Sequence, residues 1–173
     1  MRSRARLLGH PVHTLLVVFP LGLLLTATLF DLWGWASGSR FWNDLAFYLI
    51  AAGVVGGLVA APFGLVDWLA IPRGTRAKAV GAWHGGGNLL VLALFAMSWM
   101  LRRGGPHVDP TWPLILALAG AVCAFVTGWL GGELVVRLGI GVDPGAHVDA
   151  PSSLSTADAR APRVPDPKPR HHA

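Results

Sequence analysis

The segment LLGHPVHTLLVVFPLGLLLTATLF, residues 7–30, contains no Asp, Glu, Lys or Arg in 24 consecutive positions. An α-helix rises about 1.5 Å per residue, so about 20 residues cross the roughly 30 Å hydrocarbon core of a membrane. This segment is long enough and apolar enough to predict a membrane-spanning helix.

Three further segments without these four residue types follow, at 45–66, 79–101 and 110–132. Only 13% of the chain is charged, whereas a soluble domain carries about 25%. We therefore predict an all-α, polytopic membrane protein with a four-transmembrane-helix bundle in residues 1–142. The helices are expected close to 11–35, 44–71, 79–101 and 112–138. Residues 143–173 are rich in proline and predict a disordered cytoplasmic tail.

The positive charges predict the orientation of the bundle. Eleven Lys and Arg residues lie near the two termini and in the second loop, against three in the other two loops. The positive-inside rule then places both termini in the cytoplasm. The basic residues flank the apolar segments and do not form one face, so the net charge of +5 indicates a lipid bilayer as the anionic neighbour and not nucleic acid.

Small residues predict which helices pack closely. They recur at every fourth position of the second helix and the fourth, and begin a similar stripe in the third. Such stripes let helices approach closely in a membrane. We expect the second, third and fourth helices to pack most tightly and the first to face lipid more. Asp31 and Arg40 are interpreted as ordinary boundary charges.

Ionisable residues fall at a similar depth in all four predicted helices: His10, His13, Asp67, His84 and Glu133. Counted from the nearest cytoplasmic basic residue, they lie roughly 6 to 10 Å into the membrane. Asn88 extends this layer one turn beyond His84, and Arg137 follows Glu133 by one turn. Ionisable groups at such a depth are costly unless they face the bundle interior and find partners. A shared buried site is therefore predicted.

Each member of the layer also has a purely structural interpretation. His10 precedes Pro11 and would then only begin the first helix, while Glu133 would form a local ion pair with Arg137. Asp67 would bond to the second loop or to Arg73. His13 and His84 would make interhelical hydrogen bonds without chemistry.

Four motifs carry a resemblance to a known family: GHPVH at 9–13, GLVDWLAIP at 64–72, the pair His84 and Asn88, and GWLGGELVVRLGIGV at 128–142. Together they resemble the bacterial membrane family catalogued as domain of unknown function 2231, over roughly residues 7 to 142. The resemblance implies a four-helix protein of the bacterial inner membrane. Some relatives are joined to Rieske iron-sulfur domains, which implies a redox setting and an iron-sulfur protein as redox partner.

The chain departs from this family at one point of the closing motif. Many relatives carry Tyr-Arg-His where this chain has Val136, Arg137 and Leu138. The departure puts a ligand role of the third position in doubt.

The leading specific hypothesis is haem b, with iron held by His13 or His10 from the first helix and His84 from the third. Axial imidazoles approach a flat macrocycle from opposite sides, so ligands on different helices at one depth suit it. Such a site would make the chain an electron-transfer subunit. The glycines 85–87 would leave room for the porphyrin, or would serve close helix packing.

Two other classes of function stay open at this point. His13, His84, Asp67 and Glu133 form a mixed nitrogen and oxygen set that suits a transition metal or a proton relay. The outer half of the bundle offers no continuous polar path, which argues against transport by one chain. Alternatively, the chain is a membrane anchor or accessory subunit without cofactor, in which the polar layer fixes only the register of the helices.

Overall fold

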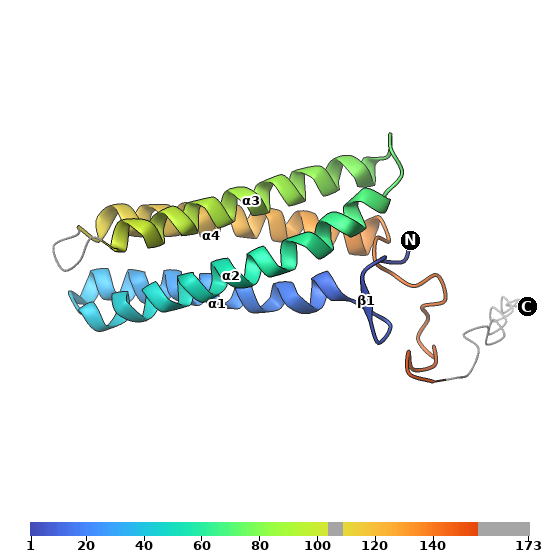
Figure 1. Ribbon diagram of the computed structural model, residues 1–173, viewed down its shortest axis with the longest axis horizontal. Coiled ribbons are helices and arrows are strands. Elements are labelled where there is room, and N and C mark those ends of the chain that lie inside the picture. Colours follow the sequence, from blue (N-terminus) through green and yellow to red (C-terminus); the bar gives the residue numbers. More distant parts are fainter. Residues whose placement is uncertain (104–108, 156–173) are drawn as a thin grey trace, which may run out of the picture.

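The computed structural model describes residues 1–103 and 109–155 and consists mainly of four long helices (Figure 1). They are α1 (Val12–Ser37), α2 (Arg40–Ala70), α3 (Arg76–Arg102) and α4 (Thr111–Gly132), which continues into a π-helical turn, η1 (Glu133–Arg137). Four spans, the last running to Arg137, are long and apolar enough to cross a membrane. The predicted four-helix membrane bundle is confirmed.

The outer surface of the bundle is apolar, as a lipid-facing surface must be. Large side chains such as Trp83 and Phe125 are more than two thirds exposed on the helices. In water such continuous apolar faces would aggregate, whereas hydrocarbon solvates them. α2 and α3 begin three or four residues earlier than predicted, at Arg40 and Arg76, because long basic side chains at a helix end can reach the interface.

The helices form two antiparallel hairpins, α1 with α2 and α3 with α4, lying side by side (Figure 1). Contacts within each hairpin far outnumber those between the hairpins. The expectation that the second, third and fourth helices pack most tightly is therefore wrong. The small residues of α2 pack against α1 instead: Gly56 lies against Phe19, and Gly64 lies against His13.

The second hairpin repeats the packing of the first at a constant register. Leu24 packs over Gly53 in the first hairpin, and Phe95 packs over Gly120 in the second. The two large residues are 71 positions apart in the chain, and the two glycines are 67 apart. All four positions are buried in the structure. The bundle is thus built from two copies of one helix-packing arrangement.

The two ends of the bundle differ, and we name them by their contents. The terminal end carries the N-terminal segment, the α2–α3 loop and residues 138–155, whereas the far end carries the α1–α2 turn and the end of α3. Residues 1–11, here called the strap, form a small antiparallel hairpin of β1 (Arg6–Leu7) and β2 (His10–Pro11). Gly9 turns this hairpin with a φ of +91°.

Residues 138–155 form turns that contact the strap. The backbone N–H of Gly141 donates to the carbonyl of Met1 at 2.8 Å, and Arg2 pairs with Asp143 at 2.8 Å. The Ser153 hydroxyl donates to the carbonyl of Leu8. The predicted disorder of residues 143–173 stays a prediction, since residues 156–173 lie outside the described part of the chain.

Candidate functional site

Two histidines meet between the hairpins near the terminal end of the bundle. His13 lies in the first turn of α1, and His84 lies in the third turn of α3. Their ring centres are 6.4 Å apart, and the ring planes are almost perpendicular, at 86°. Both side chains are half-buried. The structure therefore brings together the two imidazoles that the sequence places deepest.

Each imidazole is held by the other helix of its own hairpin. Nδ1 of His13 lies 3.1 Å from the carbonyl oxygen of Ala60, and Nδ1 of His84 lies 2.8 Å from that of Thr127. A carbonyl oxygen only accepts, so each Nδ1 carries the proton and donates it. In the neutral form of such a ring, Nε2 is the nitrogen with a lone pair, and this form binds a metal.

A glycine makes room for each of these rings. Gly64 follows Ala60 by one turn, and a side-chain carbon there would lie 2.9 Å from His13. Gly131 follows Thr127 by one turn, and a carbon there would lie 2.9 Å from His84. Both distances are too short for real carbon contacts. The glycines thus let each ring lie flush against the neighbouring helix and reach its backbone.

The two histidines occupy equivalent positions of the repeat. They are 71 residues apart, and their carbonyl partners are 67 apart, like the packing pairs of the core. When two similar units associate about a twofold axis, residues on the axis meet their own equivalents. The contact of His13 with His84 is a contact of this kind.

Among the described residues, His84 but not His13 has a further polar neighbour. The amide nitrogen of Asn88 lies 3.2 Å from Nε2 and 3.5 Å from Nδ1 of His84, and donates to the His84 carbonyl at 2.9 Å. Thr127 donates its hydroxyl to the amide oxygen of Asn88 at 3.1 Å. Because the amide nitrogen is almost equally far from the two ring nitrogens, it does not lie in line with the lone pair of Nε2. Asn88 thus contacts one side of the His84 ring and restricts its movement.

The two predicted carboxylates bond elsewhere. Asp67 accepts hydrogen bonds from the hydroxyl of Ser3 and from the backbone N–H groups of Arg4 and Ala5 in the strap. Its expected partners were the second loop or Arg73, and the strap takes their place. Glu133 pairs with Arg76 of α3 at 2.6 Å, and not with Arg137 as the local spacing suggested.

The remaining predicted residues lie at the surface. His10 is exposed in β2, outside the helices, and Arg137 is exposed at the end of η1. Within residues 1–103 and 109–155, no three His, Cys, Asp or Glu side chains are grouped closely enough to hold a metal ion. Of the predicted layer, only His13, His84 and Asn88 form one cluster.

A second polar pair, which sequence analysis missed, lies at the far end. Asp31 is almost fully buried, and both of its oxygens accept from the guanidinium of Arg102 at 2.5 Å. Arg102 also donates to the hydroxyl of Ser98, which donates to the carbonyl of Pro113. The interpretation of Asp31 as a boundary charge is therefore wrong.

One signal could have revealed this pair. Asp31 and Arg102 are 71 residues apart, the same separation as His13 and His84. They are equivalent positions of the two hairpins, so they also meet on the axis of the repeat. A search for a shared register between the first and third helices would have matched them.

The histidine cluster offers two imidazoles, one from each hairpin. Among the described residues, no third His and no Cys, Asp or Glu is grouped with them. Gly85 and Gly86 are exposed on the outer surface of α3, where a side-chain carbon would meet nothing within 4 Å. The alternative that these glycines serve close packing holds only for Gly87, which faces Thr127.

A family model described as predicted membrane protein (DUF2231) matches residues 9–144. The match covers both hairpins, the two histidines and the residues that orient them. No curated protein and no solved structure matches the chain.

Proposed function

The chain belongs to the DUF2231 family of predicted membrane proteins, and we propose that it binds haem b between its two hairpins and transfers electrons. His13 and His84 are the proposed axial ligands. Haem would supply reversible one-electron chemistry at this point of the membrane.

The separation of the two rings is the observation that carries this proposal. Two imidazoles that bind one iron through Nε2 have ring centres roughly 6 Å apart, since each metal–nitrogen bond is about 2 Å and each ring centre lies about 1 Å beyond its nitrogen. The ring centres of His13 and His84 are 6.4 Å apart. Bonds from Nδ1 to a backbone carbonyl, present in both rings, are the usual way in which proteins orient ligating histidines.

The number of donors favours haem over a bare metal ion. Structural zinc takes four protein ligands and catalytic zinc takes three, but the described residues bring only two here. A porphyrin provides the four remaining nitrogens itself, and its two faces are alike. Equivalent histidines from two equivalent hairpins suit such a two-sided ligand.

Basic residues at the terminal end support the same ligand. Arg73 and Arg137 are exposed there, and arginine pairs well with the propionate groups of haem. The excess of Lys and Arg at this end favours a cytoplasmic position for it in the bacterial inner membrane. An iron-sulfur protein is then the proposed redox partner. A periplasmic reporter, active only outside the cytoplasm, should be inactive when fused to either terminus.

The proposal is tested by the absorbance of protein purified in detergent from cells supplied with haem. We expect a Soret band, with split α and β bands after reduction, in the parent chain. His13→Ala and His84→Ala should each lose these bands, whereas His10→Ala should keep them because His10 is exposed outside the bundle. A folded but colourless parent protein would contradict the proposal. Stoichiometric zinc or iron without porphyrin would instead favour a transition-metal site.

A second function is supported by the bonds of Asn88 and Thr127 around His84. In that case the polar cluster only fixes the register of the hairpins, and the chain is a membrane anchor or accessory subunit without cofactor. Interhelical hydrogen bonds of about 0.6 kcal/mol each suffice for this. His84→Asn separates the two functions, because it keeps a hydrogen-bonding side chain but cannot ligate haem. Retained cellular function in that variant would favour the accessory role.

A further inference from the structure

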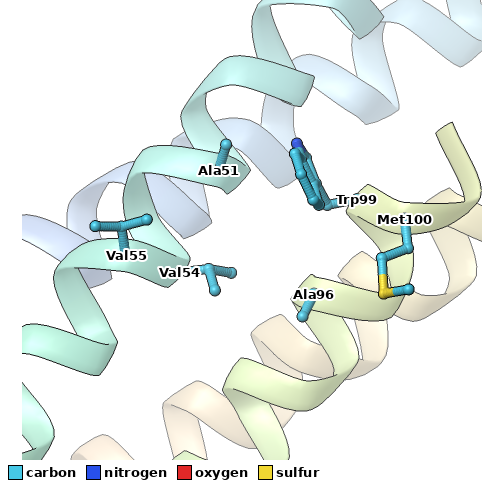
Figure 2. A pocket seen from close by; sticks show the side chains of 6 residues that line it. All are labelled: Ala51, Val54, Val55, Ala96, Trp99 and Met100. Carbon is cyan, nitrogen blue, oxygen red and sulfur yellow. The ribbon is translucent and has the colours of Figure 1, made fainter. Parts of the chain in front are cut away.

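An apolar groove lies between α2 and α3 in the half of the bundle nearer the far end (Figure 2). Its volume is about 220 Å³, and its lining residues are Ala51, Val54, Val55, Ala96, Trp99 and Met100. Val55 and Met100 are each about 60% exposed, so the groove opens towards the hydrocarbon. A linear apolar chain suits this shape.

One wall of the groove carries a buried polar atom without a partner. The indole of Trp99 extends from α3 towards Ala51 on α2, and its nitrogen lies on the side of the ring away from the α3 backbone (Figure 2). Within the described chain, Nε1 of Trp99 is buried and has no hydrogen-bond acceptor. A buried N–H group is costly unless an acceptor reaches it. A ligand in the groove that carries a carbonyl oxygen would supply one.

The equivalent position of the first hairpin has no such unsatisfied donor. Thr28 stands there, and its hydroxyl donates to the carbonyl of Leu24 at 2.9 Å. Among the described residues, the other buried donor without a partner is Nε of Arg102, whose guanidinium bonds to Asp31. The unpaired indole N–H is therefore a feature of the second hairpin and not of both copies of the repeat.

Cationic groups lie beside the groove at the far end. The guanidinium of Arg103 lies over the ring of Trp99, 5.1 Å from its centre. Phe47 stacks on the same indole and also lines a cavity of about 840 Å³. Arg40, Asn43, Asp44, Arg102 and Arg103 line this cavity too, and Arg102 is already paired with Asp31. From the far end towards the bundle centre, the seam between α2 and α3 thus presents the guanidinium of Arg103, then the N–H group of Trp99, then an apolar groove.

We propose that this seam binds a glycerophospholipid with an anionic headgroup. Its phosphate would lie at Arg103, one ester carbonyl would accept from Nε1 of Trp99, and an acyl chain would occupy the groove. In such a lipid the phosphate, the ester carbonyls and the acyl chains follow one another in the same order as Arg103, Nε1 of Trp99 and the groove along the seam. A quinone has a carbonyl and a chain but no phosphate, so it leaves the cation unused. This proposal is independent of haem binding.

Native mass spectrometry of the full chain in detergent, titrated with phosphatidylglycerol, tests the proposal. Trp99→Phe keeps the aromatic ring but removes the N–H group, and we expect about three- to tenfold weaker binding, the usual effect of one lost hydrogen bond. Arg103→Gln should weaken binding by a similar factor. Ala51→Phe fills the groove and should abolish binding. Trp83→Phe, on an exposed part of α3, is the matched control and should bind like the parent.

The lipid chosen for the titration separates the alternatives. Phosphatidylglycerol should bind more tightly than phosphatidylcholine of the same chain length, and Arg103→Gln should remove that preference. Equal binding of phosphatidylglycerol by the parent, Trp99→Phe and Ala51→Phe would overturn the proposal. Tight binding of a quinone that phosphatidylglycerol does not displace would overturn it as well. Circular dichroism of each variant confirms that the helices are intact.

Discussion

The two polar pairs on the axis of the repeat differ in a way that sets their roles apart. At the terminal end two identical residues meet, His13 and His84, and no direct bond joins their rings. At the far end two opposite residues meet, Asp31 and Arg102, and two hydrogen bonds join them. Asp31 follows His13 by 18 residues, so the pairs lie about 27 Å apart along α1.

This difference shows which pair holds the bundle together. A buried carboxylate with a two-pronged arginine bond joins the hairpins directly and fixes their register. The histidines make hydrogen bonds only within their own hairpins, so these bonds do not join the hairpins to each other. The unlike pair also selects partners, because two copies of the first hairpin would bring two Asp31 side chains together, which is strongly unfavourable.

The largest expected effect comes from breaking the far pair. Arg102→Met leaves the carboxylate of Asp31 buried without its cation, and a broken buried pair costs about 3 to 5 kcal/mol. Thermal unfolding in detergent should show this loss of stability. The exchange variant, Asp31→Arg with Arg102→Asp, should recover much of it because the two positions are equivalent. An exchange variant no more stable than Arg102→Met would contradict that equivalence.

The next largest loss of stability is expected at Gly120, and it should exceed the loss at its equivalent, Gly53. Gly120→Ala places a carbon 2.7 Å from the rigid ring of Phe95, and overpacking of this kind costs about 1 to 3 kcal/mol. Gly53→Ala meets the movable end of Leu24, so we expect a smaller loss. Gly128→Ala, where a side-chain carbon meets nothing within 4 Å, serves as the control and should unfold like the parent. Equal losses at Gly120 and Gly128 would argue against the packing described.

A smaller loss of stability is expected when the two histidines are given the same kind of neighbour. Asn88 corresponds to Val17 in the first hairpin, so Asn88→Val gives His84 the apolar neighbour that His13 already has. We expect a loss of about 0.6 kcal/mol, the average for a polar contact between membrane helices. If haem binds, its absorbance should persist in this variant, because both ligands remain. Loss of haem in Asn88→Val would show that haem binding requires Asn88 itself.

The smallest effect concerns the terminal end, where the strap closes over the histidine half of the bundle. The backbone N–H of Gly145, and then Arg2, hold the pKa of Asp143 below the ordinary value of 3.8. A lowered pKa means that this contact stabilises the fold above the ordinary value and is lost as the pH falls through the lowered one. The protection of the backbone amides of residues 139–145 against hydrogen exchange should therefore fall only in strong acid. In Arg2→Gln this loss of protection should begin at a higher pH, and an unchanged profile would contradict the ion pair.

The helices themselves could be predicted because charge marks their limits directly. A segment such as 7–30 without a charged residue has few alternatives to a membrane span. The meeting of His13 and His84 could also be predicted, since depth along a straight helix follows from counting residues. Both inferences use only distance along one helix, which the sequence contains.

The partners of each helix could not be predicted in the same way. A stripe of small residues shows that a helix is approached closely, but not by which neighbour, and α2 in fact receives α1. Asp31 and Arg102 each stand directly after an apolar segment, where a single charge is normal. Their pairing becomes visible only when the first and third helices are compared with each other. For Asp67 the sequence suggests the buried layer, the second loop or Arg73, whereas its partners lie at the start of the chain.

The strap also has a consequence for biosynthesis. Its hydrogen bonds reach Asp67 at the end of α2 and Gly141 beyond α4. A ribosome releases Asp67 only after it has made the second helix and Gly141 only after it has made the fourth helix, so the strap cannot complete its contacts before residue 141 has been made. Closure of the strap therefore follows synthesis of all four helices, and a ligand that enters the bundle from the terminal end can do so before the strap closes.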